Sequence, residues 1–116
     1  MSATTIKMVR DHSGDIEEII TEFKYSIGGD YISEVRHESG EMKAVLLSFE
    51  KFFFRTGGYT GLTVMFVEQK DMQYADIVGF GGGEGLLNIS YGANLRYATD
   101  AADLLQQAGF QELSRE

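Results

Sequence analysis

The chain has 116 residues and reads as one domain, residues 1–116, with 43% hydrophobic and 24% charged residues. It has no cysteine, which excludes disulfides and any cysteine-based catalytic or metal site. The net charge of −8, with scattered basic residues, argues against nucleic acid and anionic membranes as partners. The lack of a signal-peptide pattern and of a membrane-length apolar run indicates a cytoplasmic protein.

The first quarter of the chain predicts a short strand followed by an amphipathic helix. Residues 6–9 form the expected strand, and the turn after it offers Ser13 or Asp15 as the helix cap. Apolar residues then recur at helical spacing, as one buried stripe would require. They are Ile16, Ile19, Ile20, Phe23 and Ile27. The glycine pair 28–29 is expected to end this helix.

Four longer strands are expected in the middle of the chain, because short polar or glycine-containing turns separate apolar runs there. The expected strands cover residues 30–38, 43–55, 59–69 and 73–80. A helix over 95–108 follows, with Asn94 or Thr99 as its cap and Gly109 as its end.

The predicted order β-α-β-β-β-β-α indicates an α+β fold with two layers. Tight turns join antiparallel neighbours, so the strands are expected to form one antiparallel sheet of four to five strands. Both helices have an apolar stripe to bury, and one face of the sheet is the surface available for it.

The strand expected over 43–55 is apolar on both of its faces, although a two-layer fold needs only one apolar face. One interpretation is a β-bulge near Glu50-Lys51 that turns the apolar residues inward. The other is an outer face covered by a second subunit or a ligand, with Phe52 and Phe54 as interface candidates. We therefore expect a homo-oligomer, with a dimer as the favoured state.

The segment 79–94, GFGGGEGLLNISYGAN, contains six of the 14 glycines. Its glycine spacing matches neither the dinucleotide fingerprint nor the P-loop, which argues against a nucleotide site. Two interpretations remain: a tightly packed strand-to-helix crossover, or a loop whose backbone N–H groups hold an anion, either the carboxylate of Glu84 or that of a ligand. The candidate binding residues are Gly81, Gly82, Gly83, Glu84, Gly85, Asn88, Tyr91 and Asn94.

Catalytic and metal-binding patterns are weak in this sequence. The two histidines, His12 and His37, lie far apart along the chain and belong to no zinc-binding motif, so no metal and no cofactor are expected. Ser90 lacks the glycine-flanked elbow of serine hydrolases. Glu84 is the one candidate for an acid or base, because neighbouring apolar residues could raise its pKa.

The segment GGGEGLLNISYGAN, preceded by FEKFFFR and GLTVMFVEQ, resembles a family of small bacterial proteins of unknown function. These proteins share a glycine-rich GGGEGL…N…GA segment before their last helix. The resemblance covers most of the chain and implies a small cytoplasmic bacterial protein, but no activity and no catalytic residues.

Three functions stay open on the sequence alone. The favoured hypothesis is a non-enzymatic domain that uses residues 79–94 to bind a small molecule, a peptide or a partner. The alternative is a homo-oligomeric assembly protein without a pocket. The third hypothesis is a small enzyme that uses Glu84.

Overall fold

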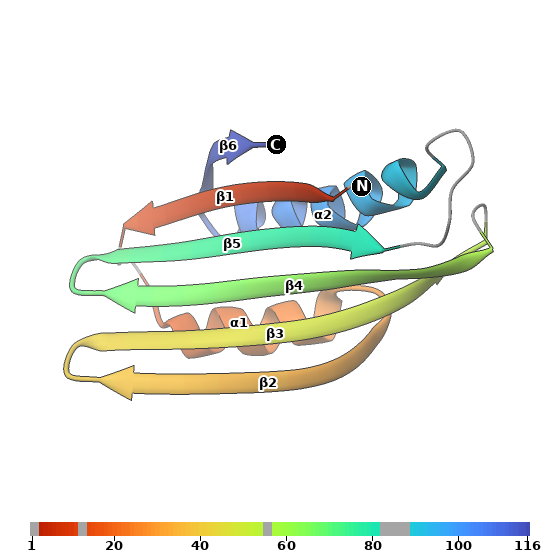
Figure 1. Ribbon diagram of the computed structural model, residues 1–116. Helices are drawn as coiled ribbons and strands as arrows, with labels where there is room; N and C mark the ends of the chain where they lie inside the picture. Colours follow the sequence, from red (N-terminus) through yellow and green to blue (C-terminus); the bar gives the residue numbers. More distant parts are fainter. Residues whose placement is uncertain (1–2, 12–13, 55–56, 82–88) are drawn as a thin grey trace.

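The computed structural model describes residues 3–11, 14–54, 57–81 and 89–116. The elements are β1 (Thr4–Asp11), α1 (Ile16–Ser26), β2 (Asp30–Ser39), β3 (Met42–Phe53), β4 (Gly58–Gln69), β5 (Met72–Gly81), α2 (Ile89–Gln107) and β6 (Gln111–Arg115). All strand pairs are antiparallel and form one sheet in the order β2-β3-β4-β5-β1-β6. Both helices lie on the same face of this sheet (Figure 1).

The predicted α+β class, with one antiparallel sheet and two helices, is confirmed. The predicted strand number is wrong, because the sheet has six strands rather than four to five. The missed strand is β6, a polar segment of five residues, QELSR, that is too short to show an alternating pattern. It forms because β1 lies near the edge of the sheet and would otherwise leave its second row of backbone groups unpaired.

The predicted start and buried stripe of α1 are confirmed. The Asp15 carboxylate accepts a hydrogen bond of 2.9 Å from the Glu17 backbone N–H, which caps the helix. Within α1, Ile16, Ile20 and Phe23 are buried. The Phe23 ring meets the rings of Phe49 and Phe66 edge-on, each at a centroid distance of 5.8 Å. These contacts fix α1 over β3 and β4.

The inner face of the sheet, defined as the face that packs against the helices, forms the core. Alternate residues of β1, β3, β4 and β5 point inward and are almost fully buried. They are Ile6, Met8, Val45, Leu47, Phe49, Leu62, Val64, Phe66, Ala75 and Ile77. From α2, Tyr97, Ala98, Ala101, Ala102 and Leu105 complete the same cluster.

Helix α2 begins at Ile89, six residues before the predicted start, so neither Asn94 nor Thr99 is its cap. The predicted end is confirmed: Gly109 has a φ of 100°, and the Phe110 backbone N–H donates to the Leu105 carbonyl at 3.0 Å. Small residues let the helix approach the sheet closely. A Cβ at Gly79 would lie 2.3 Å from the carbonyl oxygen of Asn94.

The bulge predicted near Glu50-Lys51 is wrong. The register between β3 and β4 runs without interruption from Met42↔Gln69 to Phe53↔Gly58. The register shift lies instead in the edge strand β2, between Tyr31 and Ser33. Strand β3 therefore keeps a strict alternation, and its second set of apolar side chains points away from the helices.

Candidate functional site

The outer face of the sheet, opposite the helices, carries a row of apolar side chains that no described element covers. Val35, Leu46 and Met65 lie side by side on β2, β3 and β4. Their exposed fractions are 48%, 37% and 38%, whereas the inward-pointing neighbours of Leu46 on β3 are at most 1% exposed. Figure 1 views the sheet from this face, with both helices behind it. The face is broad and open rather than enclosed.

An aromatic group lies at the end of the outer face nearest residues 79–81. Phe52 and Tyr59 are direct cross-strand neighbours, and their rings meet edge-on at 5.4 Å. Phe80, 41% exposed, lies opposite Gly61 on the neighbouring strand. A Cβ at Gly61 would lie 2.6 Å from the Phe80 ring, so the glycine provides the space in which this ring packs. Such aromatic groups supply most of the energy at many protein interfaces.

The opposite end of the outer face contains a shallow hollow of about 620 Å³. Met42, Met72 and Tyr74 contribute its apolar part, and the two hairpin turns at 39–41 and 70–71 form its border. Methionine side chains are flexible and polarisable, so they adapt readily to the shape of a partner. The outer face thus joins rigid aromatic rings at one end to an adaptable methionine surface at the other.

Charge is sparse on the two central strands of the outer face. Among the outward-pointing residues of β3 and β4, Glu50 is the one charged side chain. On the flanking strands Lys7 lies directly opposite Asp76, so those two charges offset each other. For a chain with a net charge of −8, this face is unusually neutral. It therefore matches an apolar surface better than a charged ligand.

The residues predicted as a binding loop are described only in part. Gly81 ends β5 with a φ of 81°, a conformation that glycine tolerates best. Asn94 is fully buried in α2. Gly82, Gly83, Glu84, Gly85, Asn88 and the side chain of Tyr91 lie outside the described residues. Of the predicted interface residues, Phe52 lies on the outer face, and Phe54, 92% exposed, directly follows β3.

A buried polar group near Gly81 was missed by the sequence analysis. Thr60 lies on the inner face between Lys51 and Gly81, and Thr4 lies beside Gly79. Both threonines are at most 2% exposed, and their hydroxyl oxygens meet no hydrogen-bond partner within the described part of the chain. Threonine at an inward position of a strand is the sequence pattern that could have revealed these two buried hydroxyls. Buried hydroxyls without partners are uncommon in proteins.

Tyr97 and Lys51 complete this end of the inner face. The Tyr97 hydroxyl donates a hydrogen bond of 2.7 Å to the Gly28 carbonyl at the end of α1. Burial of the ring is the main reason that the pKa of Tyr97 lies well above its usual value, so the phenol stays protonated. The Lys51 ammonium lies 5.3 Å and 5.8 Å from the ring centroids of Phe53 and Tyr97. These contacts join α2 to the connection between α1 and β2 and to β3.

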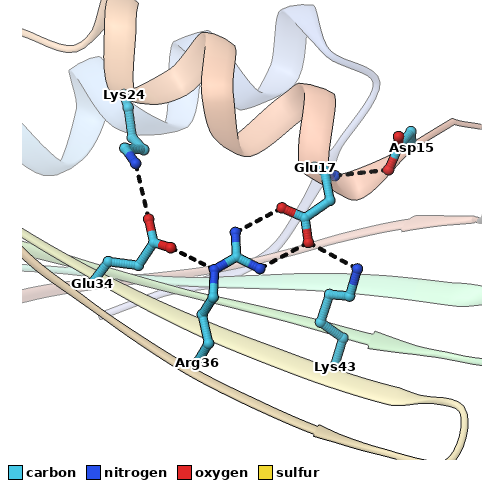
Figure 2. Close-up of polar contacts among 6 residues, drawn as sticks. All are labelled: Asp15, Glu17, Lys24, Glu34, Arg36 and Lys43. Carbon is cyan, nitrogen blue, oxygen red and sulfur yellow. Dashed lines mark hydrogen bonds and ion pairs between the residues drawn. The ribbon is translucent and has the colours of Figure 1, made fainter.

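A network of ion pairs fastens α1 to β2 and β3 (Figure 2). The Glu17 carboxylate accepts hydrogen bonds from two Arg36 nitrogens, at 2.6 and 2.9 Å, and from Lys43 at 2.8 Å. Glu34 accepts from Lys24 at 2.9 Å and from the Arg36 Nε. Hydrogen bonds from Arg36 and then Lys43 lower the pKa of Glu17 to about 2. A carboxylate held ionised in this way supports structure rather than acid–base chemistry.

The end of the inner face farthest from Gly81 is polar, and hydrogen bonds link its polar groups. The Arg10 guanidinium donates to the Gln73 side chain at 2.8 Å and to the Ala108 carbonyl, at the end of α2, at 2.8 Å. Its third hydrogen bond, of 3.2 Å, goes to the Gly14 carbonyl, and the guanidinium lies 5.4 Å from the centroid of the Phe110 ring. A cation at a helix C-terminus is favourable. This cluster locks the turn before α1 to the end of α2.

Metal binding finds no support in the described residues. Within 3–11, 14–54, 57–81 and 89–116, no group of three His, Asp or Glu side chains could hold a metal ion. His37 is exposed on β2, and His12 and Glu84 lie outside the described part. No helix in that part is long and apolar enough to cross a membrane.

Comparison with known families adds one finding. A family model matches residues 5–109, which extend from β1 through α2 and end before β6. The chain belongs to DUF6054, a family of unknown function. The expected kinship with an uncharacterised family is therefore confirmed, whereas a bacterial origin and a glycine-rich segment typical of DUF6054 stay predictions. Nothing matches among the curated proteins or among the solved structures.

Proposed function

We propose that this protein is a non-enzymatic interaction domain that pairs with a second copy of itself through the outer face of its sheet. One observation supports the proposal. Four neighbouring strands, β2 to β5, place apolar side chains on a face that no described element covers. The most exposed ones have exposed fractions from 37% to 55% and are Val35, Met42, Leu46, Phe52, Tyr59, Met65 and Phe80. The outward-pointing Val67, Met72, Tyr74 and Val78 are half-buried. Exposed apolar patches of this kind are typical of interaction sites.

The size of the face fits a stable dimer. Strands β3 and β4 contain 12 residues each, a length of about 40 Å at ~3.3 Å per residue. Four strands spaced ~4.8 Å apart cover a width of about 15–20 Å. The resulting area of about 600–800 Å² is close to the ~800 Å² that each partner buries in a standard interface.

The charge distribution favours a second copy as the occupant. Two chains that each carry a net charge of −8 repel one another at most orientations. Contact through the outer face brings the most neutral surfaces together, because Glu50 is the one charged residue among the outward-pointing residues of β3 and β4. Two such sheets would pack ~10 Å apart with strands crossing at about 30°. A two-fold axis would then join Phe52, Tyr59 and the methionines into one apolar core.

Sedimentation equilibrium of the wild type and two variants tests this proposal. The wild type is expected at twice the chain mass of 12.9 kDa. Leu46→Glu puts a charge at the centre of the face and should give monomers that remain folded. Tyr25→Glu makes the same kind of change on α1, at a side chain 93% exposed, and should remain dimeric. A wild type that is monomeric at tens of micromolar, or a Leu46→Glu variant that stays dimeric, would overturn the proposal.

A small-molecule site at the inner-face end beside Gly81 is a second candidate function. The observation that favours it is the pair of buried hydroxyls of Thr60 and Thr4, which find no partner within the described residues. Native mass spectrometry of protein purified gently from its own cells tests it. A retained mass that Thr60→Val removes would support this site, whereas a bare chain, or a mass unaffected by Thr60→Val, would count against it.

A further inference from the structure

The helix layer contains a groove that no core side chain fills. It runs between α1 and α2 and has a volume of about 240 Å³. Its apolar lining consists of Ile19, Phe23, Leu104, Leu105 and Ala108. Phe23 and Leu105 are buried at its base, and the other three are half-buried along its walls. This volume exceeds the ~150 Å³ of an apolar cavity that accommodates benzene, so a large apolar side chain fits into the groove.

Acidic residues lie on both helices that form this groove, and one of them, Glu22, lines it. Glu22 lines it on α1, with Glu18 one turn earlier, and Asp103 lies on α2 next to Leu104. All three carboxylates are exposed, and none forms an ion pair with another residue of the described part.

The basic side chains of α1 and α2 form ion pairs outside the groove. Lys24 is paired with Glu34 at 2.9 Å, as Figure 2 shows, and Arg96 with Asp100 at 3.4 Å. Neither cation lines the groove. The groove is therefore apolar at its base, and Glu22, Ser26 and Gln107 are its polar lining. The Arg10 guanidinium contacts a lining residue, and its hydrogen bond to the Ala108 carbonyl holds it there.

We propose that this groove binds a basic amphipathic helix of a partner protein. Apolar side chains of that helix, spaced three or four residues apart, would insert between Phe23 and Leu104. Its lysines or arginines would lie above Glu18, Glu22 and Asp103. A third helix set into the groove between two helices follows the usual packing of helical ridges into grooves.

The same three carboxylates argue against other occupants. An anionic lipid surface or nucleic acid would be repelled by three unpaired carboxylates. A second copy of this chain, with its net charge of −8, would also be repelled.

This inference does not rest on self-association. The groove lies in the helix layer, on the opposite side of the sheet from the outer face (Figure 1). A dimer formed through the outer face would present two such grooves pointing away from each other. The two proposals can therefore fail independently.

Binding of two synthetic peptides to the full chain tests the inference. The probe is a fluorescent peptide of about 18 residues made of leucine and lysine in a helical amphipathic pattern. Its comparison peptide has the same composition with the leucines spread around the helix. Fluorescence anisotropy at two salt concentrations gives affinities, and amide shifts in ¹⁵N-labelled protein locate the contact.

The amphipathic peptide is expected to bind at least about tenfold more tightly than its comparison peptide, and less tightly at high salt. Glu22→Lys should weaken it by about tenfold. The matched control Glu41→Lys, the same charge change in the exposed β2–β3 turn, should alter affinity less than about twofold. Equal affinities for the two peptides, equal effects of Glu22→Lys and Glu41→Lys, or shifts confined to the outer face would each overturn the inference.

Discussion

The two faces of β3 belong to the same twelve residues but have opposite surroundings. Val45, Leu47 and Phe49 point inward and are at most 3% exposed. Leu46 and Phe52 point outward and are 37% and 48% exposed. Both sets are apolar, yet within the described chain only the inner set is covered by a second layer, the helices. The helices cover the inner face of β3, and no described element covers its outer face.

The two sets of side chains therefore differ in what they stabilise. Complete burial of a large apolar side chain contributes about 1.5–3 kcal/mol. The inner set contributes that amount to the stability of one chain. The outer set keeps much of its surface in water, and that surface is available to drive association.

The largest expected effect comes from truncating the inner set. Leu47→Ala should lower the free energy of unfolding by about 2–5 kcal/mol, because it leaves a cavity in the core. Leu46→Ala, its neighbour on the outer face, should cost less than about 1 kcal/mol in protein dilute enough to be monomeric. Urea denaturation measures both. Equal losses in the dilute protein would mean that the outer face is already covered within the chain.

The contact between α2 and the inner face gives the next largest effect. Gly79→Ala should destabilise by about 1–3 kcal/mol, because the added methyl group would overlap the Asn94 carbonyl and push the helix away. Gly92→Ala is the control: within α2 its Cβ would meet nothing within 4 Å among the described residues. It should stabilise the protein by up to about 1 kcal/mol. Thermal unfolding of the two variants measures whether each substitution raises or lowers stability. A Gly79→Ala variant with unchanged stability would contradict the close approach of α2 to the sheet.

The smallest effect concerns the ion pairs at the border of the inner face. The pKa of Glu17 is about 2 in the folded chain, below the ordinary value of 4.5 that applies in the unfolded chain. Because the folded value is the lower one, its contribution is complete above pH 4.5 and is lost as pH falls toward 2. Glu17→Gln should cost about 0.5–1 kcal/mol at pH 7, since the carboxylate is partly exposed. Stability measured from pH 7 to pH 2 should then fall less steeply in Glu17→Gln than in the wild type, and parallel curves would contradict this.

Local signals in the sequence predicted much of this fold. A capping Asp15 and a regular apolar stripe placed α1, and the turn residues separated the four long strands. β6 was missed because a five-residue polar edge strand depends on the free edge of β1 rather than on its own pattern. The early start of α2 was missed because Gly92 lies inside the helix, where glycine usually indicates an end.

The candidate site was predicted in part. The two-sided apolar pattern of β3 indicated an outer surface and named Phe52, but it offered a bulge as the alternative. The uninterrupted register between β3 and β4 rules out a bulge near Glu50-Lys51, and it also brings Met65 beside Leu46, which pairs with Val35 on its other side. No local pattern reveals such neighbours, because they come from three different strands. The groove between α1 and α2 is equally invisible in the sequence, since it depends on how two distant helices lie on the sheet.

Intermolecular NOEs in a mixed sample test the central claim most directly. One half of the sample carries ¹³C-labelled methyl groups and the other half is unlabelled, so filtered spectra report contacts between chains alone. We expect NOEs from the methyl groups of Leu46 and Met65 to Leu46 or Met65 of a second copy, and from the Met42 and Met72 methyl groups to aromatic protons of Phe52 or Tyr59 of that copy. Intermolecular NOEs confined to the helix layer, or none at a concentration where the protein is dimeric, would contradict pairing through the outer face.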